Sequence, residues 1–111
     1  MSKLHQTVII TGAGSGFGRE MAKTYARNGY KVGVTDISTE RADETLELIG
    51  GSQAGHFSTQ LDVQSVADWS ALKESIPASW PGLGVLINNA GVAAGGRLED
   101  TPLEDWQWVL D

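Results

Sequence analysis

Four short segments along the chain, in which apolar residues either follow one another or alternate with polar ones, are candidates for strands. In chain order they cover residues 7–11, 31–36, 56–61 and 85–87. The first run, Thr-Val-Ile-Ile-Thr, stops at Gly12 and is typical of a strand that is buried on both faces. We therefore predict four strands, of which the third alternates most weakly.

The segment after the first run repeats with the period of a helix. Large apolar side chains recur every four residues, and we expect this stripe to face the core: Phe17, Met21 and Tyr25. Small residues recur in the same way one position later: Gly18, Ala22 and Ala26. The small stripe would let the helix lie close to a sheet, and Asn28-Gly29 would end it.

Two further helices are expected between the remaining strands. The second helix would end at Gly50-Gly51, and its buried face would consist of Ala42, Thr45, Leu46 and Ile49. The third helix would begin at Ser65, with Asp68 as its capping-box partner, and would end at Pro77. Its buried side chains would be Val66, Trp69, Leu72 and Ile76.

Strands and helices alternate throughout, and the connections between them are short. This order predicts parallel strands that are joined by right-handed crossovers. With the first strand at the centre, winding outward gives the spatial order 3-2-1-4, with helices on both faces. We therefore predict an α/β fold, in which residues 1–111 form one domain with a Rossmann-type doubly wound parallel sheet.

The composition excludes several classes of site and partner. The 111 residues include no Cys, and 14 acidic against 8 basic residues give a formal net charge of −6. A disulfide scaffold and a thiolate metal site are thereby excluded, and the acidic balance argues against nucleic acid and against a membrane surface. His5 and His56 lack metal-ligand spacing. Because there is neither a membrane-length apolar run nor a signal-peptide pattern, we expect a cytoplasmic protein.

A glycine-rich turn stands between the first strand and the first helix, with glycine at positions 12, 14, 16 and 18. A helix N-terminus presents unpaired N–H groups and a partial positive charge, which suit a diphosphate. Glycine lets an anion approach the backbone and allows unusual φ angles. No Lys follows, which excludes a P-loop, and Phe17 stands where Gly-x-Gly-x-x-Gly needs its third glycine. The alternative is a tight turn that binds no ligand.

The acidic residue Asp36 ends the second predicted strand, 20 residues after Gly16. A carboxylate at this place can accept hydrogen bonds from the ribose hydroxyls of adenosine, and it would repel a 2′-phosphate. We therefore favour NAD over NADP as the cofactor. Two alternatives remain open: Asp36 can simply begin the turn into the second helix, and Arg41 can reach a 2′-phosphate.

Three motifs together resemble those of the short-chain dehydrogenase/reductase family. Thr11–Gly18 is similar to its Thr-Gly-x-x-x-Gly-x-Gly motif, Asn88–Gly91 to its Asn-Asn-Ala-Gly motif, and Asp62-Val63 to the pair that contacts adenine. The resemblance implies a set of cofactor-binding residues in addition to Asp36. They are Gly12, Ser15, Gly16, Phe17, Gly18, Asp62, Val63, Asn89, Ala90 and Gly91.

The resemblance also implies individual roles. Asp62 would accept a hydrogen bond from the adenine amino group, and the Val63 N–H would donate to the ring; the alternative is an Asx-type turn. The segment Asn89–Gly91 would contact the cofactor near its ribose, with a polar turn as the alternative. Asn88 would tie neighbouring strands together.

The activity that the resemblance implies is hydride transfer between a nicotinamide cofactor and an alcohol or ketone. The family's catalytic Tyr-x-x-x-Lys has no match, because Tyr25 is followed four residues later by Gly29, and Tyr30 by Val34. We therefore assign no catalytic residue and expect a chain that ends before the catalytic segment and is inactive alone. The alternatives are a non-catalytic dinucleotide-binding module and, with less suitable glycine spacing, a nucleotide-sugar or flavin protein.

A fourth helix is predicted to begin at Thr101, which Pro102 and Glu104 follow as typical first-turn residues. The resemblance implies that this helix forms the interface of a homo-oligomer, where Trp108 would be buried by the partner. The fourth strand would be an edge of the sheet, with Val85 and Ile87 uncovered and open to pairing.

Overall fold

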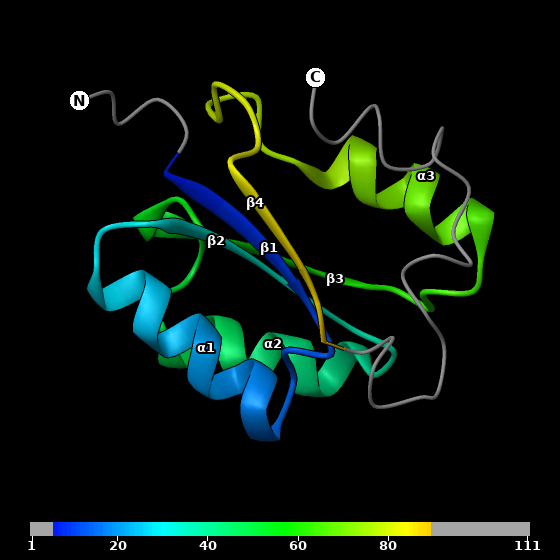
Figure 1. The fold of residues 1–111 in the computed structure, drawn as a ribbon, viewed down its shortest axis with the longest axis horizontal. Coiled ribbons are helices and arrows are strands. Elements are labelled where there is room, and N and C mark those ends of the chain that lie inside the picture. The colour runs from blue at the N-terminus through cyan, green and yellow to red at the C-terminus, as the bar shows by residue number, and fades with distance from the viewer. Residues whose placement is uncertain (1–5, 90–111) are drawn as a thin grey trace.

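The computed structural model describes residues 6–89, and the strands and helices found there follow the predicted order (Figure 1). They are β1 (Thr7–Thr11), α1 (Gly16–Arg27), β2 (Lys31–Asp36), α2 (Thr39–Leu48), β3 (Phe57–Gln60), α3 (Val66–Ser75) and β4 (Val85–Asn88), with a 3₁₀ turn at Ser52–Ala54. The predicted helix at Thr101 and the site residues Ala90 and Gly91 lie outside the described residues.

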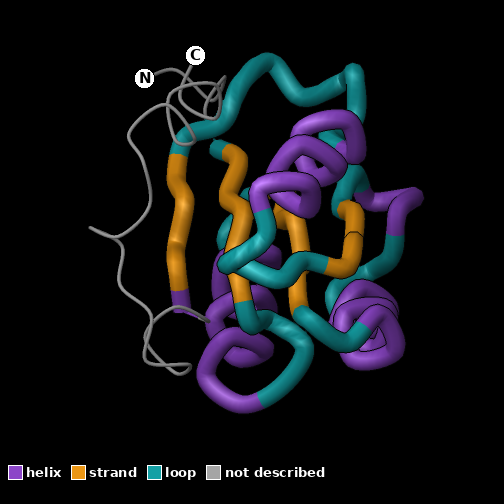
Figure 2. The backbone as a smooth tube through the Cα atoms, turned by 90° about the vertical axis from the view of Figure 1, so that its right-hand side faces the viewer, coloured by secondary structure: helices purple, strands orange, loops and turns teal. Residues whose placement is uncertain are grey.

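The strands form one parallel sheet in the order β3-β2-β1-β4, which confirms the predicted fold class (Figure 2). Val8 on β1 pairs with Val32 on one side and with Val85 on the other. Every residue of β1 is buried, as expected for a central strand. Because all four strands are parallel, their carboxyl ends lie at the same edge of the sheet, where ligands of such folds bind.

Helices cover both faces of this sheet. Figure 1 shows α1 and α2 together on one side and α3 on the other. Under α1 and α2 the buried core consists of Val8, Ile10, Ala13, Ala22, Val32, Val34 and Ala42. Under α3 it consists of Ile9, Phe57, Leu61, Trp69, Leu72, Trp80 and Leu83. The alternation of side chains along β1 therefore supplies both cores from one strand.

The predicted large stripe of α1 is wrong at its first member. Phe17 is 81% exposed, whereas Met21 and Tyr25 pack half-buried at the side of the core. The small stripe lies against the sheet as predicted, and Gly18 approaches the Gly12 carbonyl so closely that no Cβ would fit. This close approach fixes the rotation of α1, and Phe17 is left outside.

The predicted start of α3 is confirmed, but two of its details are wrong. The Ser65 hydroxyl accepts a hydrogen bond from the Asp68 N–H as expected, but the Asp68 carboxylate accepts from the Asp62 N–H at 2.8 Å and does not close a capping box. Val66 is 63% exposed rather than buried. The Trp69 indole donates to the Val63 carbonyl, so the ring lies back over the first turn of α3. The buried position that was predicted for Val66 is therefore occupied by Trp69.

Within the described residues, β4 pairs only with β1 and ends the sheet. Val85 and Ile87 are nonetheless half-buried against the core beneath α1 and α2, so they are less uncovered than predicted. No helix among residues 6–89 is long and apolar enough to cross a membrane.

Candidate dinucleotide-binding site

The loop between β1 and α1 needs glycine for two different physical reasons. Gly12 and Gly16 have φ angles of +66° and +56°, in the left-handed region that only glycine enters at low cost. At Gly14 the backbone angles are ordinary, but a Cβ would lie 2.7 Å from the Arg41 Cβ and 2.8 Å from the Asp36 Cγ. Gly18 is required by its contact with Gly12. The pattern is therefore a property of the folded loop itself, before any ligand is considered.

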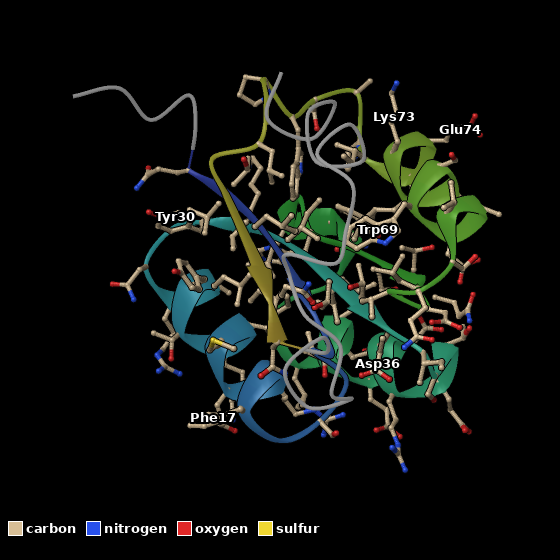
Figure 3. The ribbon with its side chains drawn as sticks, turned by 45° about the vertical axis from the view of Figure 1, so that its right-hand side comes forward. Phe17, Tyr30, Asp36, Trp69, Lys73 and Glu74 are labelled. Carbon is tan, nitrogen blue, oxygen red and sulfur yellow. The ribbon has the colours of Figure 1, made fainter. Side chains whose placement is uncertain are left out.

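The outer half of this loop presents unused hydrogen-bond donors. No acceptor for the N–H groups of residues 15–18 is found in the described part of the chain, and the Ser15 hydroxyl makes no capping bond. Ser15, Gly16 and Phe17 are exposed, and Figure 3 shows Phe17 at the outer surface of the first turn of α1. Four free donors at a helix N-terminus form an electropositive site that suits a diphosphate.

Asp36 lies at the end of β2 (Figure 3), and both of its carboxylate oxygens already accept hydrogen bonds from the backbone. Oδ2 accepts from the Gly14 N–H and Oδ1 from the Ser38 N–H, each at 2.9 Å. The turn that the sequence left open as an alternative is therefore present, and Asp36 in addition ties the glycine loop to β2. Each carboxylate oxygen can accept two hydrogen bonds, so the group keeps capacity for a ribose hydroxyl.

A pocket of about 290 Å³ lies at the carboxyl edge of the sheet. It is lined by Gly12, Asp36, Ile37, Leu61, Asp62, Val63 and Gln64. The fold thus brings together four residues that the sequence predicted separately, although up to 51 positions divide Gly12 from Val63. Sequence reasoning missed Ile37, Leu61 and Gln64 as lining residues; each directly adjoins a predicted one, and this proximity is the only signal that could have found them.

Asp62 and Val63 form the turn between β3 and α3. Asp62 Oδ1 accepts from the Gln64 N–H at 3.0 Å, which is the Asx-type turn that was left open. Among the described residues no acceptor for the Val63 N–H and no donor to Asp62 Oδ2 is found. One acceptor and one donor therefore remain beside the pocket, which is the pattern that an adenine edge needs.

The two asparagines at the end of β4, Asn88 and Asn89, contact β1 and the glycine loop. The Thr11 hydroxyl donates to Asn88 Oδ1 at 2.9 Å, which confirms that Asn88 ties β1 to β4. The Asn89 amide nitrogen donates to the Gly12 carbonyl at 3.2 Å. Asn89 thus contacts the glycine loop.

The buried histidine, His56, belongs to the core beneath β2 rather than to this site. Its Nδ1 accepts from the Val32 N–H at 2.9 Å. Burial, together with the positive charge of Lys31, lowers the pKa of His56, against a hydrogen bond with the Ile49 backbone that raises it. The imidazole is therefore neutral at pH 7. Within residues 6–89 no group of three or more potential metal ligands lies together.

Comparison with known proteins points to one family. A family model described as short chain dehydrogenase matches residues 6–111. The D-threitol dehydrogenase of Mycolicibacterium smegmatis is 30% identical over 105 residues, which are 95% of this chain and 40% of that protein. The NADP-dependent 3-hydroxy acid dehydrogenase of Salmonella typhi is 37% identical over 106 residues, 94% of this chain and 41% of that protein.

The solved structures agree with the sequence relatives. A 7α-hydroxysteroid dehydrogenase in complex with NADH and 7-oxo glycochenodeoxycholic acid matches with a TM-score of 0.65 at 33% identity, covering 96% of this chain and 42% of that one. The chain therefore spans about two fifths of the length of the curated relatives cited above.

Proposed function

Because this chain belongs to the short-chain dehydrogenase family, we propose that it forms the dinucleotide-binding part of an NAD(P)-dependent oxidoreductase acting on an alcohol or ketone. One observation carries the proposal. The outward N–H groups of residues 15–18 and the pocket beside Asp36 and Asp62 lie at the same edge of the sheet, joined through Gly12. A diphosphate-linked nucleoside needs this combination of an anion site and an adjoining pocket.

The residues present fit such a cofactor. The N–H groups of residues 15–18 would donate to the diphosphate. Asp36 would accept from the adenosine ribose, and the free Asp62 oxygen and Val63 N–H would pair with the adenine edge. A pocket near 290 Å³ is at the lower end of the roughly 300–1,000 Å³ of small-molecule sites, and so suits one nucleoside rather than the whole dinucleotide.

The other half of the cofactor would lie toward the fourth strand. Asn89, Ala90 and Gly91 would contact it near its ribose. When bound, the nicotinamide supplies the hydride acceptor or donor. The chain has no Tyr-x-x-x-Lys, so we place the proton-transferring groups in the part of the relatives that this chain does not match.

We further propose that NAD is preferred over NADP. The supporting feature is the buried Asp36 carboxylate, which its bonds to Gly14 and Ser38 hold at the pocket wall. A 2′-phosphate would meet this charge at close range. Arg41 is the opposing feature, since its Cβ lies beside Gly14 and its exposed side chain can reach a phosphate. The relatives cited above include both an NADP-dependent enzyme and a complex with NADH.

The test is a calorimetric titration of the complete protein with NAD⁺ and NADP⁺. We expect NAD⁺ to bind at least about tenfold more tightly, equivalent to roughly 1.4 kcal/mol. The variant Arg41→Ala should leave NAD⁺ affinity unchanged. NADP⁺ binding that equals or exceeds NAD⁺ binding would contradict the role of Asp36, and failure to bind either nucleotide would contradict the proposed function.

A further inference from the structure

Two residues of the glycine loop, Ala13 and Gly14, have no free backbone group. The Ala13 N–H donates to the Thr35 carbonyl at 2.8 Å, and the Ala13 carbonyl accepts from the Thr45 hydroxyl at 2.9 Å. The Gly14 N–H donates to Asp36, and its carbonyl accepts from the Arg19 guanidinium at 2.6 Å. Two consecutive residues are thus fully bonded to the protein, directly before the residues whose donors are free.

Arg19 and Thr45 connect the two carbonyls of this segment to α2. Arg19 Nε donates to the Thr45 Oγ1 at 2.8 Å, while Nη2 bonds both the Gly14 carbonyl and, at 3.0 Å, the Glu44 carboxylate. Thr45 is completely buried, and its single proton goes to the Ala13 carbonyl. One guanidinium and one hydroxyl therefore form a continuous hydrogen-bonded link from the loop to the second helix.

The orientation of these carbonyls matters to an anion site. A carbonyl oxygen that turned toward the diphosphate would repel it, and a loop with four glycines has many backbone conformations to visit. Holding the Ala13 and Gly14 oxygens toward α2 keeps the following four N–H groups turned outward. A ligand binds more tightly to a loop whose conformation is already fixed, because the loop then loses less conformational entropy on binding.

We propose that Arg19 and Thr45 are positioning residues of the diphosphate site, which hold the glycine loop in its donor-outward conformation without contacting the ligand. The inference rests on the proposed function. It predicts that affinity for a diphosphate ligand depends on two residues of α1 and α2 whose side chains bond the backbone of the loop rather than the ligand.

The competing explanation is simple attraction between the Arg19 charge and the diphosphate. Variants of Thr45 distinguish the two explanations, because Thr45 belongs to the link but carries no charge. If Arg19 acts through charge alone, Thr45→Val should have no effect. If the link positions the loop, Thr45→Val should act like Arg19→Met, and Thr45→Ser, which keeps the hydroxyl, should restore binding.

The experiment compares ADP-ribose and adenosine as calorimetric probes of the complete protein. We expect Arg19→Met and Thr45→Val each to weaken ADP-ribose binding about tenfold, in keeping with the loss of one charged hydrogen bond, and to leave adenosine binding unchanged. Lys23→Met is the matched control, since Lys23 lies on the same helix and, among residues 6–89, forms an ion pair only with Glu20 at the surface. In the unliganded protein, hydrogen exchange at the hydrogen-bonded amides of Ala13 and Gly14 should be faster in both variants and unchanged in the control.

Three results would overturn the inference: an equal loss for both ligands, a loss for Arg19→Met with none for Thr45→Val, or unchanged amide exchange in both variants. A parent protein that binds neither probe would instead overturn the proposed function. The exchange measurement needs no ligand, so it still decides whether Arg19 and Thr45 hold the loop.

Discussion

A substitution at Gly16 can show whether this residue matters for ligand binding or only for folding, because Gly29 provides a matched control in the same chain. Gly16 and Gly29 stand at opposite ends of α1, with φ angles of +56° and +88°. A Cβ added at either position would meet nothing within 4 Å. The variants Gly16→Ala and Gly29→Ala therefore impose the same kind of backbone strain and no steric clash within the described protein.

The cost to folding should be similar at the two positions. A non-glycine residue in the left-handed region costs roughly 1–2 kcal/mol. Part of this is offset, by about 0.4–1 kcal/mol, because alanine restricts the unfolded chain more than glycine does. We expect each variant to lose about 1 kcal/mol of unfolding free energy, as measured by urea denaturation.

The cost to binding should differ strongly between them. The Cβ at residue 16 would project from the middle of the four free donors, and an anion that is kept away loses at least two hydrogen bonds. A hydrogen bond to a charged group contributes roughly 1.5–3 kcal/mol, so Gly16→Ala should weaken NAD⁺ binding by about 3 kcal/mol, or roughly a hundredfold. Gly29 lies about 18 Å away at the far end of a 12-residue helix, and its variant should bind like the parent.

The assay is isothermal calorimetry of the complete protein at a temperature where both variants remain folded. If Gly16→Ala binds NAD⁺ as tightly as Gly29→Ala does, the backbone donors of residues 15–18 do not grip the diphosphate, and the site has been placed wrongly.

Two further outcomes follow from packing and titration. Gly18→Ala should destabilise the protein by roughly 3 kcal/mol, the upper end of overpacking costs, because its Cβ would overlap the Gly12 carbonyl; an unfolding midpoint like that of the parent would show that the loop and helix can separate at no cost. The lowered pKa of His56 keeps the folded imidazole neutral while the unfolded one takes up a proton below about pH 6.5. Unfolding is then favoured by acid, so stability should fall as the pH drops from 7 toward 5. His56→Gln should show a smaller decrease over that range in urea midpoints, and an identical slope would assign the effect to other groups.

The sequence predicted the elements that local pattern controls. The β-branched run of β1 and the Ser65 cap are recognisable because neighbouring residues alone determine them. Phe17 was misplaced because the sequence predicted that both neighbouring stripes of α1 pack inward, whereas the contact between Gly18 and Gly12 rotates the helix toward the small stripe and leaves Phe17 outside. Such a contact joins atoms of two separate segments of the chain, and the repeat of residues within one helix cannot predict it.

In the candidate site, too, the sequence predicted the features that local pattern determines and missed those that depend on contacts between distant segments. Spacing indicated that Asp36 would stand at the carboxyl edge, since a strand end fixes its position. It did not reveal the bond to Gly14, which depends on how the loop folds back over β2. Thr45 was expected on the buried face of its helix, but nothing in the sequence indicated that Arg19 and Thr45 bond the glycine loop, because an arginine on a helix is usually solvated and a buried threonine is usually only packed.

Asp36 joins cofactor choice to the shape of the loop. Its carboxylate would select the ribose, but the same group accepts the Gly14 N–H and the Ser38 N–H. Replacing it with alanine to admit a 2′-phosphate would therefore leave a buried N–H without an acceptor, at a cost of roughly 1–3 kcal/mol, and would release the loop that binds the diphosphate. Asparagine removes the charge and keeps one acceptor oxygen for the buried Gly14 N–H, while its amide nitrogen replaces the oxygen that accepts from the partly buried Ser38 N–H. A change of preference from NAD to NADP is for this reason better sought with Asp36→Asn than with Asp36→Ala, because the diphosphate is common to both cofactors and its site must survive the change.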